Sequence, residues 1–472
     1  MKIGRTVFSI FMARSKQKKK ATPGQEALST AKISNRYFLA AYFLFALQGG
    51  VALLGAVDLV IPDLPSPVPA EYGRSIHLGL AVFWPLIGTM GLINYFVQSE
   101  LQRTIYSYRL LRWQFWLVFL SALAIYSTLA LGIGNGREYL EGLPVFYLGV
   151  CLSLMLGIYN LFRTIIKAGR ASPPVVCMVS GMMFLFLLLL PNAFSHSNPV
   201  ADESIRFWVV HSWEEVAFEL TTTGIVAAFL LETALADRKT VEKLLYLEIT
   251  LTTVGGLFGV GHHYFWLGFP AYWLIIGTAF SCLQVVPVIL LGYLAYKALR
   301  LKQPLSKRVK LSWLLILSSL FYHITGAAGL GLTITVPMIN LYMHGTLLTS
   351  GHAHLALFGS LGLLVLGGSF YCLSSGAELD DQAFRRGKAG VLLLNGGLLA
   401  MGTALILAGM IETYLLRVAG MNFSAVQGVI RPYLLARAGG GLIFTSGDLL
   451  LAWTIFTVYK GKRARANPAP AK

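Results

Sequence analysis

Residues 341–370 read LYMHGTLLTSGHAHLALFGSLGLLVLGGSF, and this run decides the class of fold. It contains three histidines but no Asp, Glu, Lys or Arg. A helix needs roughly 20 apolar residues to cross a bilayer, and this run is longer than that. The whole apolar stretch, 337–375, is too long for one simple span, so we expect it to include an extramembrane lead-in.

The rest of the 472-residue chain has the same character: 56% of it is hydrophobic and only 12% is charged. Soluble domains carry about 25% charged residues, so a soluble enzyme is excluded. We predict an all-α polytopic membrane protein with twelve transmembrane helices in a single membrane domain, 37–460. It is flanked by a basic N-terminal extension, 1–36, and a tail, 461–472. The twelve predicted spans are approximately 37–61, 75–98, 111–133, 144–167, 172–193, 207–235, 243–268, 270–297, 309–332, 337–375, 388–412 and 436–460.

The positive charge is divided unequally between the two ends of these spans. An even number of spans puts both termini on one side, and this side holds 32 of the 38 Lys and Arg residues. Cytoplasmic loops collect such residues, so we predict that both termini are cytoplasmic. Membrane topology and attraction to anionic lipid then account for the basic runs, and no nucleic-acid partner is expected. The six residues on the opposite side are Arg74, Arg137, Arg206, Arg417, Arg431 and Arg437.

Ionisable side chains inside predicted spans are costly and usually functional. The first group is His211-Ser-Trp-Glu-Glu215, in which the terminal residues lie one helical turn apart on the same face. They can bind one metal, and Glu219 continues the face. The alternative is a hydrogen-bonded network between helices. For the isolated His323, a packed and hydrogen-bonded role is expected.

The second group is the pair His262-His263. Adjacent helical residues differ by about 100°, yet both rings can reach a metal held between two helices. Together with His211 and Glu215 they make a site of three nitrogens and one oxygen. A carboxylate ligand suits iron better than copper, so the set favours non-haem iron.

The third group is His352-Ala-His354. Residues i and i+2 of a helix are about 200° apart around its axis, so these two rings point to opposite sides. They suit two separate haems, since haem iron readily takes axial histidine. Gly351 and Ala353 leave room for flat macrocycles. His77 is the free candidate for the second axial ligand of one haem, and the other haem keeps an open position toward the non-haem metal.

These three groups, in this order on twelve spans, resemble the haem-copper oxidase superfamily. Their details look like the nitric oxide reductase large (catalytic, cytochrome b) subunit of the cytochrome c-linked type, over residues 37–460. The resemblance implies that His77 and His354 ligate a low-spin haem b and that His352 is the proximal ligand of a high-spin haem b3. The non-haem iron ligands that it implies are His211, His262, His263 and Glu215, with Glu219 beside them.

The resemblance also implies a calcium site near the haem propionates. Its ligands would be Glu138, in Gly136-Arg-Glu-Tyr-Leu-Glu141, and the backbone carbonyl of Gly88. Calcium prefers such oxygen ligands. A plain solvated loop carboxylate is the alternative for Glu138.

The reaction implied is the joining of two NO molecules, with two electrons and two protons, to give N₂O and water in a bacterial inner membrane. None of the four cysteines lies in a CxxCH motif, so electrons would come from a separate membrane-anchored cytochrome c subunit. Protons would come from the outer side through Glu138, Glu141 and Glu219. The N-terminal segment lacks the cytochrome-like extension of the quinol-linked type. Glu215 stands where copper-containing oxygen reductases carry a tyrosine.

One departure keeps other functions open. The family usually has a glutamate in the helix after the histidine pair, and here the string is Leu283-Gln284-Val-Val-Pro287. Gln284 forms hydrogen bonds but carries no titratable proton. Rival interpretations are an oxygen reductase or NO dismutase-like enzyme, a non-catalytic di-haem electron-transfer protein, and a transporter that uses its histidines as a proton relay.

Overall fold

The computed structural model describes residues 23–61, 70–137, 139–192, 194, 196–301 and 304–466, and its regular elements are all helical. They are α2 (Pro23–Val60), α3 (Ala70–Leu101), α4 (Tyr108–Ala130), α5 (Pro144–Ala168), α6 (Pro173–Asn192), α7 (Pro199–Ser212), η1 (Trp213–Phe218), α8 (Glu219–Glu232), α9 (Arg238–Gly259), α10 (Gly261–Tyr264), η2 (Phe265–Leu267), α11 (Tyr272–Arg300), α12 (Lys307–Tyr322), η3 (His323–Leu330), α13 (Gly331–Thr335), α14 (Pro337–Met343), α15 (Leu347–Ala353), η4 (His354–Gly362), α16 (Leu363–Leu373), α17 (Asp381–Thr413), η5 (Tyr414–Val418) and α18 (Phe423–Ala466).

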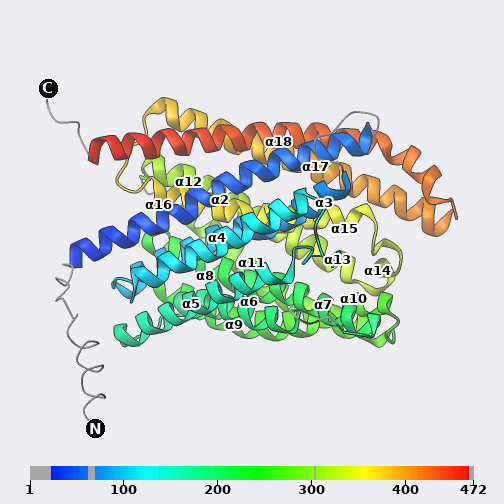
Figure 1. Ribbon diagram of the computed structural model, residues 1–472, viewed down its shortest axis with the longest axis horizontal. Helices are drawn as coiled ribbons and strands as arrows, with labels where there is room; N and C mark the ends of the chain where they lie inside the picture. Colours follow the sequence, from blue (N-terminus) through cyan, green and yellow to red (C-terminus); the bar gives the residue numbers. More distant parts are fainter. Residues whose placement is uncertain are drawn as a thin grey trace, which may run out of the picture.

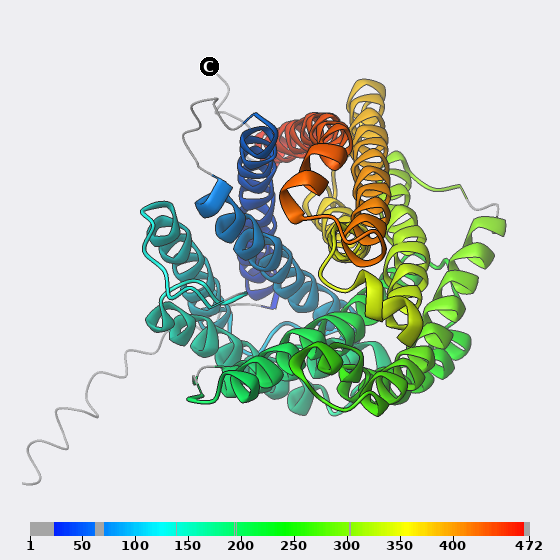
Figure 2. The same cartoon turned by 90° about the vertical axis from the view of Figure 1, so that its right-hand side faces the viewer.

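The long helices lie side by side along one axis (Figure 1). Viewed along that axis they surround a shared interior (Figure 2). The first described helix, α2, packs against the last, α18. The start of α2 and the end of α18 lie at the same end of the bundle, as an even number of crossings requires.

Eleven helices in the described part of the chain are long and apolar enough to cross a membrane. The all-α membrane fold predicted from the sequence is therefore confirmed. The predicted span at 207–235 is not among the eleven. Its place is taken by the continuous helix α7–η1–α8, which includes Glu214, Glu215 and Glu219. Nearly all of α8 is nevertheless buried in the bundle, so this polar helix is the twelfth member.

Two predicted boundaries are now placed by the structure. The stretch 337–375 is divided: α14 ends at Met343, and the long helix begins at Leu347. The short lead-in predicted from the excess length is therefore present. At the N-terminus, α2 begins at Pro23, inside the basic segment 1–36. Residues 1–22 lie outside the described part.

Four π-helical segments interrupt the described helices, and three of them begin at or near histidines that lie inside predicted spans. η1 begins two residues after His211, η3 begins at His323, and η4 begins at His354. π-Helical turns are rare and are often found at functional sites. Each one changes the helical phase, so it alters which side chains face the interior.

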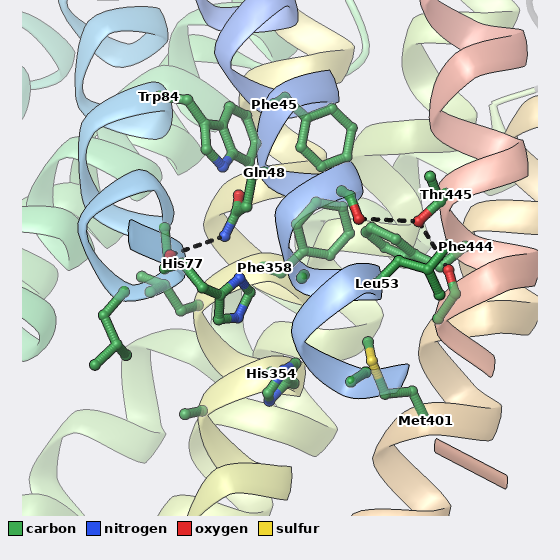
Figure 3. Close-up of a pocket in the computed structure, with 18 of the residues that line it drawn as sticks. Phe45, Gln48, Leu53, His77, Trp84, His354, Phe358, Met401, Phe444 and Thr445 are labelled. Carbon is green, nitrogen blue, oxygen red and sulfur yellow. Dashed lines mark hydrogen bonds between the residues drawn. The ribbon is translucent and has the colours of Figure 1, made fainter. Parts of the chain in front are cut away.

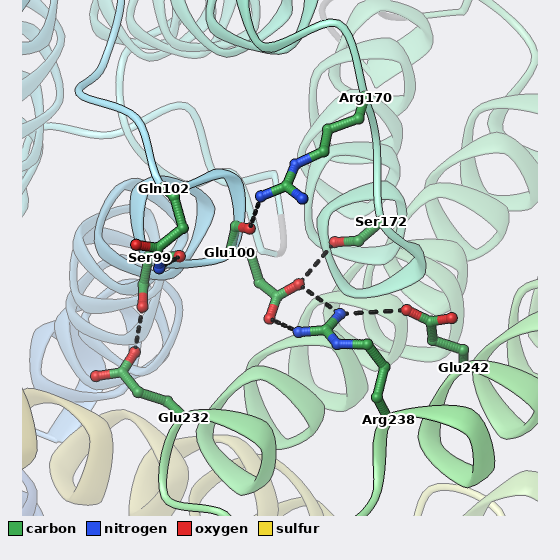
Figure 4. Close-up of polar contacts among 8 residues, drawn as sticks. All are labelled: Ser99, Glu100, Gln102, Arg170, Ser172, Glu232, Arg238 and Glu242. Atoms are coloured by element: carbon green, nitrogen blue, oxygen red, sulfur yellow. Dashed lines mark hydrogen bonds and ion pairs between the residues drawn. The ribbon is translucent and has the colours of Figure 1, made fainter.

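A cluster of polar side chains joins several helices (Figure 4). Arg238 at the start of α9 binds both carboxylate oxygens of Glu100, at 2.9 and 3.1 Å, and also contacts Glu242. Ser172 and Arg170, between α5 and α6, bind the side chain and the backbone carbonyl of Glu100. The cluster therefore links α3, α6 and α9.

Candidate metal and haem centre

Three of the predicted ligands meet at one point. His211 at the end of α7 and the pair His262-His263 on α10 each direct a ring nitrogen to a common region, and these nitrogens lie within 4.8 Å of one another. The ring centroids are 4.3 to 5.5 Å apart. His211 and His262 are buried. This arrangement is a group that can hold a metal ion.

Glu215 adds an oxygen beside the three nitrogens. Its Oε2 lies 3.2 Å from Nε2 of His211. Both atoms are buried, and neither has a hydrogen-bond partner among the described residues. Unpaired buried polar atoms are costly, so two such atoms facing each other call for a cation or a proton between them. The donor set fits a non-haem metal with three nitrogens and one oxygen.

The backbone around the histidine pair is closely packed. A Cβ atom at Gly277 of α11 would lie 2.2 Å from the backbone nitrogen of His262. At Gly259, it would lie 3.0 Å from Nε2 of His211 and 3.3 Å from Oε2 of Glu215. Glycine at these two positions therefore allows α10 to lie against α11 and leaves space beside the ligands.

The rings of the pair are oriented by their neighbours. Nδ1 of His262 lies 3.4 Å from the hydroxyl of Ser281, and the ring of His263 stacks on Phe207 with centroids 5.2 Å apart. Such contacts to the outer side of a ligand fix its direction toward a metal. Nδ1 of His263 has no hydrogen-bond partner in the described part of the chain.

A cavity lies between Glu215 and His352. Its lining includes Glu214, Glu215, Glu219, Gln284, His323 and His352, together with Ala327, Ala328 and Gly331. Nδ1 of His352 is bonded to the backbone carbonyl of Gly326 at 2.9 Å, which leaves Nε2 as the free nitrogen. Small residues on one side and a single free imidazole nitrogen fit a haem held by His352.

His77 and His354 face each other in a second cavity (Figure 3). Their rings are stacked, with centroids 6.0 Å apart and planes 25° apart. Nδ1 of His354 is bonded to the carbonyl of Ser350 at 2.7 Å, which leaves its Nε2 free. Two facing imidazoles fit the two axial positions of one haem.

The walls of this second cavity are mainly apolar. Phe45, Trp84, Phe358 and Phe444 line it, as a macrocycle requires. Arg437 of α18 also lines it, and its Nε has no hydrogen-bond partner among the described residues. A half-buried guanidinium fits the propionate groups of a haem, since arginine binds carboxylates strongly. From the sequence alone, Arg437 was interpreted only as a topology signal.

Gln284 occupies a structural position in the metal centre. Its Nε2 donates to the backbone carbonyl of Glu215 at 2.9 Å and lies 3.5 Å from the carbonyl of Thr252. In a π-helical segment some carbonyls lack an ordinary helical partner, and Gln284 supplies one. It therefore fixes the backbone of η1 against α9 and α11.

Glu219 and His323 form a buried pair. Nε2 of His323 lies 2.7 Å from Oε2 of Glu219. The packed, hydrogen-bonded role expected for His323 is therefore confirmed. Its partner is the carboxylate that the sequence had grouped with the metal ligands.

The calcium site stays a prediction. Glu138 lies outside the described residues, and Gly88 lies in the middle of α3, packed against Val365 and Ala41. Glu141, from the same loop as Glu138, is buried.

The sequence profile of one family, described as Cytochrome C and Quinol oxidase polypeptide I, matches residues 32–443. The chain belongs to this family. It is accordingly a subunit I of the haem-copper oxidase superfamily. The family implies haems and a metal centre.

Individual relatives give more detail. The chain is 28% identical over 440 residues to a nitric oxide reductase subunit of Stutzerimonas stutzeri, and the match covers 88% of this chain and 92% of that protein. It is 24% identical over 367 residues to a bacteroid cytochrome c oxidase subunit 1 homolog of Bradyrhizobium diazoefficiens, covering 69% and 63%. A solved heme-copper terminal oxidase dimer has the same fold, with a TM-score of 0.74, 14% identity and coverage of 91% of this chain and 84% of that chain.

Proposed function

We propose that this chain is the catalytic subunit of a nitric oxide reductase, which reduces two NO to N₂O and water at a haem b3 and non-haem iron centre. The observation that carries the proposal is the carboxylate of Glu215, 3.2 Å from Nε2 of His211 beside the histidine triad. A set of three imidazoles and one carboxylate favours iron over copper. The extended similarity to a nitric oxide reductase subunit supports the same choice.

The residues around the cavity would each have a defined task. His211, His262, His263 and Glu215 would hold the non-haem iron, and His352 would hold haem b3. When bound, the two irons supply electrons and charge stabilisation and bring two nitrogen atoms together. Glu215 would reduce the positive charge of the site. The pair Glu219–His323 would hold a proton beside the cavity, because its two members share one hydrogen bond at 2.7 Å.

Electrons would enter through haem b, held by His77 and His354. His354 is separated from His352 by Ala353 alone, and Ala353 lines both cavities. Two haems on the two flanks of one short segment would therefore lie close together. A membrane-anchored cytochrome c subunit would deliver the electrons, since the chain has no CxxCH motif.

The experiment that tests this function is a metal, haem and turnover assay of the purified protein. We expect two b-type haems and about one non-haem iron per chain, with no copper, in accord with the donor set. The reduced protein, supplied with NO without oxygen, should form one N₂O for every two NO consumed.

The rival functions give different results. Copper in place of non-haem iron, together with oxygen consumption and no N₂O, would identify an oxygen reductase. Two haems without a non-haem metal, and no consumption of either gas, would identify an electron-transfer protein. Absence of haem would contradict every role given to His77, His352 and His354.

A further inference from the structure

Glu248 is a carboxylate to which the proposed function assigns no role. It lies in α9 and is fully buried, with a relative exposure of 0%. Its Oε1 lies 3.2 Å from the hydroxyl of Thr223 and 3.0 Å from that of Thr252. Its Oε2 has no hydrogen-bond partner among the described residues. No cation is bonded to this carboxylate in the described part, which makes its ionised form costly.

Thr223 connects Glu248 to the cavity. Its Oγ1 lies 3.4 Å from Oε1 of Glu219, which in turn binds His323 through Oε2. A threonine hydroxyl has a single proton to donate. It donates to only one of the two carboxylates, so the other must itself be protonated for both contacts to be hydrogen bonds. Two hydrogen bonds between Thr223 and these carboxylates therefore need at least one proton on the pair Glu219–Glu248.

The position of this proton follows from the surroundings of each group. Glu219 has His323 at 2.7 Å, which stabilises its anion whenever the imidazole is charged. Glu248 has only two hydroxyl neighbours. The other titratable side chains that interact with it are Glu219, whose carboxylate disfavours a second negative charge, and the thiol of Cys177 in α6, which is uncharged and offers no compensating cation. Glu248 is thus the carboxylic acid of the pair.

Glu248 also lies next to the position where the family glutamate is replaced by Gln284. The amide of Gln284 lies 3.5 Å from the backbone carbonyl of Thr252, and the hydroxyl of Thr252 donates to Glu248. Glu248, which can carry a titratable proton, therefore lies on the helix that neighbours Gln284, whose amide has no titratable proton.

We propose that Glu248 is the proton donor to Glu219, through the hydroxyl of Thr223, and so is a positioning residue for the proposed NO reduction. In this step the O–H bond of Glu248 breaks and its proton passes to Oγ1 of Thr223. The hydroxyl proton of Thr223 passes to Oε1 of Glu219. Glu248 is left as the carboxylate, Glu219 becomes the acid, and a proton taken up from solution restores the acid form of Glu248 between turnovers. The expected effect of Glu248 on the rate of N₂O formation rests on the proposed function. The presence of a proton on the pair Glu219–Glu248 does not depend on it.

The kinetic test uses four variants of the full-length protein in its native complex. Glu248→Gln keeps the shape and removes the proton, and Thr223→Val removes the relay hydroxyl. Glu248→Asp and Thr223→Ser retain the acid and the hydroxyl. The matched control is Glu232→Gln, which removes a carboxylate at the other end of α8 that is bonded to Tyr95, Ser99 and Tyr371.

We expect Glu248→Gln and Thr223→Val to lower the maximal rate of N₂O formation by about 100-fold, a usual size for loss of proton transfer. The KM for NO, the haem content and the non-haem iron content should be unchanged. The Asp and Ser variants should recover much of the rate, and the control should resemble the wild type. Wild-type rates in Glu248→Gln would overturn the proposal, as would a loss of rate with no recovery in Glu248→Asp.

Infrared difference spectra, recorded on reduction of the haems, test the proton itself without any substrate. A carboxylic acid C=O band that shifts in D₂O should be present in the wild type and in Glu232→Gln, and absent in Glu248→Gln. A wild type with this band but without N₂O formation would contradict the proposed function and leave the acid at Glu248 established. A wild type that forms N₂O but has the same spectrum as Glu248→Gln would contradict the assignment of Glu248 alone.

Discussion

His352 and His354 are separated by one residue, yet their side chains line two different cavities. Each has its Nδ1 bonded to a backbone carbonyl, of Gly326 and Ser350 respectively. These bonds fix the tautomer and direct Nε2 outward. The two residues therefore act at independent positions in spite of their proximity in sequence.

This independence leads to a prediction for single variants. His354→Ala should reduce the haem content from two to about one per chain and remove the low-spin optical and paramagnetic signals, because haem with two axial histidines is low-spin. His352→Ala should remove the high-spin haem and keep the low-spin signals. His196→Ala is the control, since this histidine is exposed and lines neither cavity. Loss of the same haem from both variants would contradict the two-site assignment.

Glu214 and Glu215 are a second pair of residues that are close in sequence but have different expected roles. Only Glu215 has a carboxylate oxygen 3.2 Å from Nε2 of His211. Glu215→Gln should weaken binding of the non-haem metal by about 100-fold, which is measured as iron per haem after dialysis against a chelator. Glu214→Gln should keep its iron. Equal losses in the two variants would mean that the charge of the cavity, not ligation by Glu215, retains the metal.

At the scale of elements, the apolar runs predicted the long helices because a bilayer requires them, but they did not predict the π-helical segments. A π turn depends on which tertiary partners satisfy the displaced carbonyls, as Gln284 does for Glu215. The sequence signal for Glu248 was present, namely an acid within the predicted span 243–268. It was missed because Glu248 is not at ligand spacing with a histidine. Arg437 was missed since it is 83 residues from His354.

The contact between α10 and α11 gives an element-scale prediction. Gly277→Ala would put a Cβ atom 2.2 Å from the backbone of His262, so the two helices must separate. We expect a loss of about 1–3 kcal/mol in stability, the usual cost of overpacking, together with a lower iron content. Thermal unfolding and metal analysis measure these effects. Gly396→Ala in α17, where a Cβ would meet nothing within 4 Å, should cause neither change.

At the scale of the whole molecule, the two ends of the bundle differ in function. The elements that carry the histidine groups, α7, α10 and α15, lie toward one end, and the polar cluster around Arg238 lies at the other. Both described ends of the chain lie at the cluster end. The charge pattern of the sequence predicts that this end is cytoplasmic.

Labelling in intact cells tests this orientation. The connection between α6 and α7 lies toward the histidine end, and α17 begins toward the opposite end (Figure 1). Ser197, in that connection, and Gln382, near the start of α17, are both exposed. A membrane-impermeant maleimide, given access to the periplasm, should label Ser197→Cys and not Gln382→Cys. Permeabilised cells should label both, because both positions are exposed. The reverse pattern would place the metal centre near the cytoplasm, so a cytochrome c on the outer side would no longer be a suitable donor to the haem of His77 and His354.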